Sequence, residues 1–201
     1  MHDTRELVLV TGSSGFIGRT LVRWLAAHYT VVALDRPGPP APPREADCVA
    51  VDLAADDDVR AALDDVRGRH GARIASVVHL AAHFDLAGEP HPDYEGVTVR
   101  GTERLLRALQ SFQVGQFVFA STMLVHAPTE PGRPIDEDAP LDPKLPYRAS
   151  KIRTEKLIRE QRGEIPAVFL RPAGVYDEGG HASFLAHQIA RIYERRRNSR
   201  V

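Results

Sequence analysis

The sequence predicts an α/β fold, a doubly wound parallel sheet whose strands lie in the order 3-2-1-4-5-6. Short apolar segments rich in β-branched residues alternate along the chain with longer segments of helical periodicity. The short segments are apolar at nearly every position, which is typical of strands that helices cover on both faces. Right-handed crossovers between parallel strands then give this order, with a ligand site where the carboxyl ends of the first and fourth strands meet.

The first strand and the first helix flank a glycine-rich turn. Residues 8–11 are apolar or β-branched, the glycines that follow have the spacing G-x-x-G-x-x-G, and residues 16–28 are amphipathic. Gly12 would let the chain turn sharply, Gly15 would let a pyrophosphate approach the backbone, and Gly18 would let helix and strand pack closely. The N–H groups and the positive dipole end of the helix favour phosphate. The turn therefore predicts a dinucleotide site, with a plain tight turn as the alternative.

The other elements follow from the same periodicities and from the proline- and glycine-rich stretches that interrupt them. Strands are predicted at residues 30–35, 48–53, 74–80, 116–120 and 167–170, helices at residues 56–69, 102–112, 147–162 and 183–197, and long loops at residues 37–43 and 127–146. The sequence contains no internal repeat, so we expect these elements to form a single domain over residues 1–201.

Composition limits the kind of protein. The 201 residues are 43% hydrophobic and 26% charged, which suits one globular domain with a buried core. A net charge of -1 gives no general attraction to nucleic acid or to an anionic membrane. No apolar run is long enough to span a membrane. A polar N-terminus and a single cysteine, Cys48, favour a reducing, cytoplasmic location.

An acidic residue ends the second predicted strand. Asp35 lies about twenty residues beyond the glycine-rich turn, where a carboxylate can accept hydrogen bonds from an adenosine ribose. Because this carboxylate would repel a 2′-phosphate, it favours NAD over NADP. Arg36 follows it and could instead pair with that phosphate, which keeps NADP as the alternative. An ordinary strand-end acid in a turn is the alternative without a ligand.

A phenol, an amine and a hydroxyl could move a proton at the same edge of the sheet. Tyr147 and Lys151 are four residues apart on a predicted helix and so share one face. A free phenol has a pKa of about 10, and a nearby ammonium with a cationic nicotinamide would lower it toward ~7, a change of about 4 kcal/mol. Ser121 and Thr122 directly follow a strand, where a hydroxyl could hold the same reacting oxygen. A solvated Tyr–Lys pair and a strand-end cap are the alternatives.

Taken together, these motifs make the chain resemble the short-chain dehydrogenase/reductase superfamily, and within it the extended, NAD-dependent epimerase/dehydratase branch, which has a Rossmann fold. The resemblance runs over residues 7–176. The matching stretches, in the family's order, are Thr11-Gly12-Ser13-Ser14-Gly15-Phe16-Ile17-Gly18, Asp35, Asp52-Leu53, His79-Leu80-Ala81-Ala82, Gly101-Thr102, Ser121-Thr122, Tyr147-x-x-x-Lys151 and Leu170-Arg171-Pro172.

The resemblance implies a role for each matched position. Thr122, Tyr147 and Lys151 would form the catalytic group, with Tyr147 as the acid/base. The implied chemistry is hydride transfer at a hydroxyl or carbonyl carbon of a small-molecule substrate, with NAD as cofactor. The implied cofactor contacts are Gly12, Gly15, Phe16, Ile17 and Gly18 at the pyrophosphate, Asp35 and Arg36 at the adenosine ribose, Asp52 and Leu53 at the adenine, Leu80, Ala81 and Ala82 after the fourth strand, Thr98, and Tyr147, Lys151 and Pro172 at the nicotinamide end.

The chain departs from the family pattern at four points. Thr98 stands where an Asn is common, and it keeps one hydrogen bond without the reach of the amide. His126 and Gly174 stand where nucleotide-sugar members commonly have a Tyr and an Asn, which favours a hydroxysteroid or another small ketone or alcohol as substrate. The chain stops just past the sixth strand, so residues 172–201 would begin a truncated substrate-binding part.

Two function classes follow from this pattern. The first is an NAD-dependent oxidoreductase or epimerase/dehydratase. The alternative is a non-catalytic NAD(P)-binding or redox-sensing module, or the cofactor-binding fragment of a longer enzyme, because most of the substrate domain is missing from this sequence.

Other partners are not indicated. The nine histidines show no metal-ligand spacing, so no metal site is expected, and we expect His79 and His83 to serve core and loop roles. The basic residues 195–200 fit a solvated helix end better than a nucleic-acid site. The resemblance implies a possible homodimer through the helices at residues 102–112 and 147–162.

Overall fold

The computed structural model of the chain contains a six-stranded parallel sheet, and it describes residues 5–38, 40, 43–85, 88–176 and 189–193. The strands are β1 (Leu7–Thr11), β2 (Thr30–Asp35), β3 (Asp47–Ala50), β5 (Ser76–His79), β7 (Phe117–Ala120) and β8 (Ala167–Leu170). They lie in the order β3-β2-β1-β5-β7-β8. Numbered along the chain within this sheet, that is the predicted order 3-2-1-4-5-6, which is confirmed.

The register of the sheet brings the ends of three strands together. Thr11 pairs with Leu34 of β2 on one side and with His79 of β5 on the other. Backbone bonds extend this pairing, because the Gly12 N–H donates to the Leu34 carbonyl (3.0 Å) and the Leu80 N–H donates to the Thr11 carbonyl (3.2 Å). The glycine-rich turn therefore leaves the sheet between β2 and β5, at the switch point where doubly wound sheets bind ligands.

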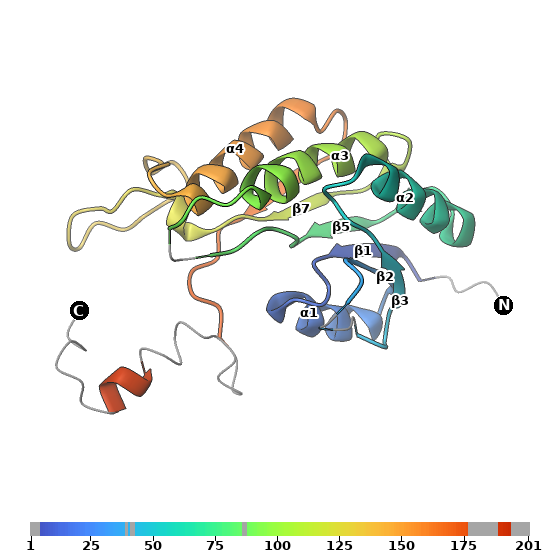
Figure 1. Cartoon of the computed structure of the whole chain (residues 1–201), viewed down its shortest axis with the longest axis horizontal. Helices are drawn as coiled ribbons and strands as arrows, with labels where there is room; N and C mark the ends of the chain where they lie inside the picture. The colour runs from blue at the N-terminus through green and yellow to red at the C-terminus, as the bar shows by residue number, and fades with distance from the viewer. Residues whose placement is uncertain (1–4, 39, 41–42, 86–87, 177–188, 194–201) are drawn as a thin grey trace.

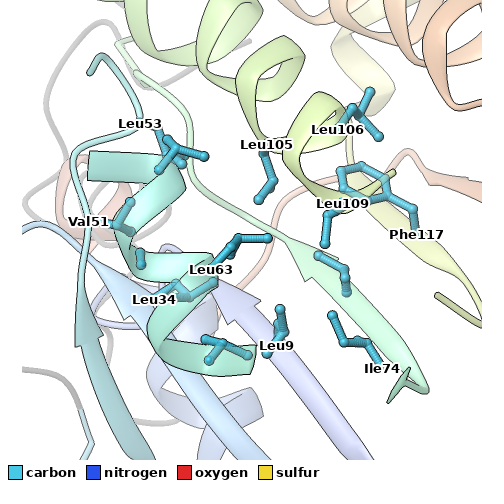
Figure 2. Packing of buried hydrophobic residues seen from close by; sticks show 14 of the residues in the cluster. Leu9, Leu34, Val51, Leu53, Leu63, Ile74, Leu105, Leu106, Leu109 and Phe117 are labelled. Atoms are coloured by element: carbon cyan, nitrogen blue, oxygen red, sulfur yellow. The ribbon is translucent and has the colours of Figure 1, made fainter. Parts of the chain in front are cut away.

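Helices pack on both faces of the sheet. They are α1 (Phe16–Ala26), α2 (Asp56–His70), α3 (Arg100–Leu109) and α4 (Pro146–Gln161). Figure 1 shows α2, α3 and α4 side by side on one face and α1 on the other. Figure 2 shows the apolar layer beneath α2 and α3, in which Leu9 and Leu34 of the sheet face Leu63 and Leu105. These side chains are at most 3% exposed, and burial of each contributes about 1.5–3 kcal/mol.

Several boundaries differ from the prediction. The helix predicted at residues 16–28 ends at Ala26, and the strand predicted at residues 48–53 ends at Ala50. Val51 and Leu53 are apolar because they are buried (4% and 5% exposed), although neither lies in a strand. A hydrophobic pattern indicates which residues are buried, but it does not distinguish an extended strand from a buried turn that follows the strand.

Several short elements were not predicted from the sequence. Two-residue strands β4 (Arg73–Ile74) and β6 (Gln113–Val114) form a second parallel sheet, and a 3-10 turn, η2 (Met123–Val125), follows β7. A π-helical segment, η1 (Tyr94–Val99), runs directly into α3. Elements of two or three residues are too short to show a period. Of the helix predicted at residues 183–197, residues 189–193 are helical and the rest lies outside the described residues.

The face that carries α1 is only partly covered in the described part of the chain. Val168 and Leu170 of β8 are 42% and 50% exposed, and a hollow of 780 Å³ lined by Leu25, Val78 and Val118 lies between α1 and the neighbouring strands. Helices flank both faces of the sheet as predicted, but the described residues leave the β8 end of the α1 face open. Within the described residues, no helix combines the length and the apolar character needed to cross a lipid bilayer.

Candidate functional site

The backbone of the turn after β1 requires its glycines. Gly12 has a φ of 68°, which side chains rarely adopt, and a Cβ there would lie 2.8 Å from the backbone nitrogen of Ala81. A Cβ on Gly18 would collide with the Gly12 carbonyl oxygen, so α1 approaches the turn closely only because residue 18 is glycine. Gly15 caps α1, and its N–H donates to the same carbonyl at 3.1 Å. The sharp turn and the close packing expected from the sequence are both present.

Two buried hydroxyls in this turn have no partner among the described residues. Ser13 and Ser14 are 0% and 6% exposed, and the Oγ atom of each makes no hydrogen bond there. Buried hydroxyls are normally hydrogen-bonded, so an unpartnered pair indicates a polar group from outside the chain. The positive end of the α1 dipole lies beside them, which favours an anion such as a phosphate. Neither serine was predicted as a cofactor contact, because glycine spacing does not indicate which hydroxyls are buried.

A pocket of 460 Å³ lies over the turn. Asp35 is part of its wall and is held by two backbone donors, the Ser14 N–H on Oδ2 (2.7 Å) and the Arg36 N–H on Oδ1 (2.8 Å). Each carboxylate oxygen keeps a lone pair for a further donor. The predicted cofactor residues that line this pocket are Gly12, Gly15, Asp35, Arg36, Leu53, Leu80, Ala81 and Ala82.

Three predicted residues lie beside this pocket without lining it. Phe16 and Ile17 begin α1 directly after Gly15 and are 37% and 39% exposed. Asp52 follows β3 by two residues, and its Oδ1 accepts from the Ala54 N–H at 2.9 Å. That bond leaves the second carboxylate oxygen of Asp52 available for an amine.

Thr98 and Pro172 are used within the protein. Thr98 is fully buried, and its hydroxyl accepts from the His83 N–H at 2.9 Å. It therefore fixes the loop that follows β5. The Pro172 carbonyl accepts from the Met123 N–H at 2.9 Å, which continues the pairing of β7 with β8 past the strand ends.

The phenol, the hydroxyl and the amine that the sequence singled out lie together. Tyr147 and Lys151 are one turn apart on α4, and the Lys151 ammonium is 5.8 Å from the centre of the Tyr147 ring. The Thr122 hydroxyl, two residues past β7, hydrogen-bonds the Tyr147 phenol. Lys151 Nζ donates to the Ala120 carbonyl at 2.8 Å. Phe84 packs edge-on against the Tyr147 ring, with ring centres 5.0 Å apart.

Burial acts against the charged forms of both proton-carrying groups. It raises the pKa of Tyr147 to about 12, although the hydrogen bond from Thr122 opposes that rise. It lowers the pKa of Lys151 to about 7, although the Glu155 carboxylate opposes that fall. The expected depression of the phenol pKa is therefore not produced by the protein's own groups, because excluding water penalises phenolate and ammonium alike.

His126 and Gly174 offer no free hydrogen-bonding side chain. His126 is 6% exposed, and its Nδ1–H donates to the Ala139 carbonyl at 3.0 Å. Its Nε2 accepts from Arg171 at 3.1 Å, because a guanidinium only donates. Both ring nitrogens are therefore in use, and glycine has no side chain to contribute at position 174.

The other histidines of this region have structural partners. His79 is fully buried, with Nδ1 2.7 Å from the Thr11 hydroxyl and Nε2 2.9 Å from the Thr102 hydroxyl, which confirms its core role. A further cluster was not predicted from the sequence. His83 and His91 stack with ring centres 4.1 Å apart, and Asp93 Oδ2 lies 3.9 and 3.8 Å from their Nδ1 atoms. The His91 Nδ1 lone pair accepts from the Asp93 N–H at 3.2 Å, so the cluster fastens its loop.

Comparison with known proteins identifies similar chains. A model of the NAD dependent epimerase/dehydratase family matches residues 8–200. Human 3 beta-hydroxysteroid dehydrogenase type 7 is 32% identical over 205 residues, which cover 93% of this chain and 53% of the human protein. UDP-glucose 4-epimerase of Azospirillum brasilense is 35% identical over 157 residues, which cover 76% of this chain and 44% of that protein. The chain thus spans about half the length of these relatives.

Solved structures with the same fold contain NAD. UDP-glucose 4-epimerase of Thermus thermophilus, in complex with NAD, superposes with a TM-score of 0.72 at 29% identity, covering 94% of this chain and 63% of that one. A short-chain dehydrogenase/reductase superfamily protein of Agrobacterium tumefaciens with bound NAD has a TM-score of 0.66 at 32% identity, covering 83% and 48%. These likenesses confirm the predicted fold class.

Proposed function

This chain belongs to the NAD dependent epimerase/dehydratase family, and from that premise we propose that it binds NAD and serves hydride transfer at a carbon bearing a hydroxyl or carbonyl oxygen. One observation carries the proposal. A glycine-rich turn, whose two serine hydroxyls have no partner among the described residues, lies at the same sheet edge as a Thr–Tyr–Lys group. A module that only bound a dinucleotide would need the turn and would have no need of a buried lysine beside a tyrosine.

The pocket over the turn would hold the nucleotide. The hydroxyls of Ser13 and Ser14, with the N–H groups at the start of α1, would bind the pyrophosphate. Asp35 would accept from the adenosine ribose through the lone pairs that its backbone donors leave free, and its charge favours NAD. The exposed Arg36 is the side chain through which NADP would bind instead.

The Thr–Tyr–Lys group would carry the proton. When bound, nicotinamide supplies the hydride acceptor or donor. In the oxidation of a secondary alcohol, Tyr147 would take the hydroxyl proton as the carbon loses its hydride and becomes a carbonyl, and reduction reverses both transfers. Thr122 would hold the reacting oxygen. Lowering the pKa of Tyr147 from about 12 to near 7 takes about 7 kcal/mol, and the Lys151 ammonium and a positive nicotinamide ring both act in that direction.

The surroundings of Tyr147 favour a compact apolar alcohol or ketone, such as a hydroxysteroid. The exposed ring of Phe84 lies against Tyr147 and offers an apolar surface. His126 has both nitrogens committed, and Gly174 has no side chain to hold a sugar nucleotide. The similarity to the human hydroxysteroid dehydrogenase supports this class. Epimerisation of a nucleotide sugar is the second candidate, supported by the UDP-glucose 4-epimerase relatives.

Calorimetric titration with NAD⁺ and NADP⁺ tests the nucleotide half. We expect the chain to bind NAD⁺ more tightly than NADP⁺, and Asp35→Ala to weaken NAD⁺ binding at least about tenfold, since it removes charge-assisted bonds to the ribose. Asp64→Ala, on the exposed side of α2, is the matched control and should leave the affinity unchanged. A preference for NADP⁺ would indicate that Arg36 pairs with the 2′-phosphate. Binding of neither nucleotide would overturn the proposal.

Turnover tests the catalytic half. Tyr147→Phe should abolish hydride transfer in a panel of hydroxysteroids, small ketones and nucleotide sugars, because it removes the phenol oxygen that acts as the acid/base. The affinity for NAD⁺ should stay within about threefold of that of the parent chain. Unchanged turnover would refute the role of Tyr147. NAD⁺ binding without transfer to any member of the panel would support the non-catalytic module instead.

A further inference from the structure

Three side chains in register join α4 to the segment that leaves β7. Tyr147, Lys151 and Glu155 are spaced four residues apart, so they lie on one face of the helix. Each bonds to a different member of the consecutive residues 120–122. The bonds join Tyr147 to the Thr122 hydroxyl, Lys151 to the Ala120 carbonyl at 2.8 Å, and Glu155 to the Ser121 hydroxyl at 2.6 Å.

Glu155 is a buried carboxylate with a full set of donors. It is 1% exposed, and Arg171 grips it with two bonds, Nε to Oε1 (3.0 Å) and a terminal nitrogen to Oε2 (2.6 Å). Arg159 adds a third bond at 3.1 Å. Burial acts to raise the pKa of Glu155, but Arg171 and Ser121 hold that pKa below its ordinary value. The carboxylate is therefore ionised at neutral pH, although a buried carboxylate without such partners would be protonated.

Arg171 connects this carboxylate to the rest of the sheet edge. It follows β8 directly, and its other terminal nitrogen donates to the Glu137 carbonyl (2.9 Å) and to His126 Nε2 (3.1 Å). The Arg171 guanidinium therefore joins the end of β8 to helix α4 and to the long loop that follows η2. Bidentate pairing of this kind fixes orientation as well as distance.

We propose that Glu155, gripped by Arg171, is a positioning residue that holds the segment 120–122 against α4 and keeps the Lys151 amine charged beside Tyr147. The inference deepens the proposed function, on which it rests. Among the described titratable groups that interact with Lys151, Tyr147 and the buried His79 are uncharged at neutral pH. Glu155 alone in this set supplies a negative charge to stabilise the ammonium.

The scarcity of lysine makes this testable without turnover. The chain has only three lysines, Lys144, Lys151 and Lys156. A protein labelled with 13C at lysine Cε therefore gives three NMR signals that can be followed against pH. The variant Lys151→Met assigns the signal of the buried lysine. Glu155→Gln keeps the shape and an acceptor for Ser121 but removes the charge. We expect the Lys151 midpoint to move down by about 1 pH unit, the shift that one nearby charge produces. Glu160→Gln, an exposed carboxylate on the same helix, is the control and should leave the midpoint unchanged.

The direction of the shift separates positioning from mere support of the fold. If Glu155 only stabilised the fold, its replacement would let water reach Lys151, and the midpoint would rise toward that of a free lysine. A rise, or no shift, overturns the proposal. If Glu155→Gln does not fold because Arg171 is left unpaired, the double variant Glu155→Gln with Arg171→Met removes both charges. A smaller downward shift is then expected, because the loss of the nearby positive charge offsets part of the loss of the carboxylate. Loss of turnover in Tyr147→Phe tests the proposed function separately, since this titration needs neither NAD nor substrate.

Discussion

The buried amine of Lys151 should make the free energy of unfolding depend on pH in a way that one substitution removes. Burial lowers the pKa of Lys151 from 10.5 to about 7 in the folded chain. Between these values the unfolded chain binds more protons than the folded chain, so stability rises with pH there. Below the folded pKa both states are protonated and the whole penalty is present, about 5 kcal/mol for 3.5 pH units at 1.36 kcal/mol each. Above pH 10.5 the penalty is absent.

Lys151→Met keeps the length of the side chain and removes the amine. The variant leaves the Ala120 carbonyl without its donor, which costs about 1–3 kcal/mol at every pH. At pH 7.5 the removed penalty is about 4 kcal/mol, so the variant should be more stable than the parent chain. At pH 9.5 the removed penalty is only about 1 kcal/mol. The stability difference between variant and parent should therefore fall by about 2–3 kcal/mol over this interval.

Urea denaturation of both proteins at pH 7.5 and pH 9.5 measures this difference, and effects of other titrating groups cancel in it. Lys156→Met is the matched control, because Lys156 lies exposed on the same helix and stays solvated in both states. Its effect on stability should be the same at both pH values. A pH-independent effect of Lys151→Met would show that the amine is not desolvated, and it would refute the lowered pKa of Lys151.

Three further predictions concern the turn, the phenol and the sheet face. Gly12→Ala should lower the free energy of unfolding by about 1–3 kcal/mol, because φ is positive there and a Cβ would meet the backbone of Ala81. Gly68→Ala, in the open interior of α2, should raise the free energy of unfolding by about 0.5–1 kcal/mol. Urea denaturation measures both effects. The phenolate absorbance of the chain minus that of Tyr147→Phe should show no ionisation below about pH 11, and an earlier rise would contradict the burial of the phenol. Leu170→Thr should change stability by less than about 1 kcal/mol in thermal unfolding, since this side chain is half exposed; a larger loss would mean that the face is covered.

Much of the fold could be read from periodicity and glycine spacing alone. The strand order was predictable because apolar segments, helical segments and right-handed crossovers leave few arrangements of a parallel sheet. Gly12 and Gly18 could be placed because a turn and a close approach each require the absence of Cβ. The group of Thr122, Tyr147 and Lys151 could be predicted because strand ends and a four-residue helical spacing are local properties.

Other features depend on residues far apart in the sequence. Ser13 and Ser14 have hydroxyls without a partner in the described part of the chain, and this depends on what packs around the turn, which no local pattern indicates. The ion pair of Glu155 with Arg171 joins a helix to the end of a strand sixteen residues later, and nothing in either segment alone indicates it.

Local spacing and handedness were thus enough to predict the order of the strands, the glycine-rich turn and which side chains share an edge of the sheet. The charges at that edge depend instead on tertiary packing. The pKa of Tyr147 rises and that of Lys151 falls because both are buried, and burial is set by every element that packs around them. Packing likewise turned His126 toward Arg171 and left the outer strand face of β8 open in the described residues, since both depend on which surfaces meet.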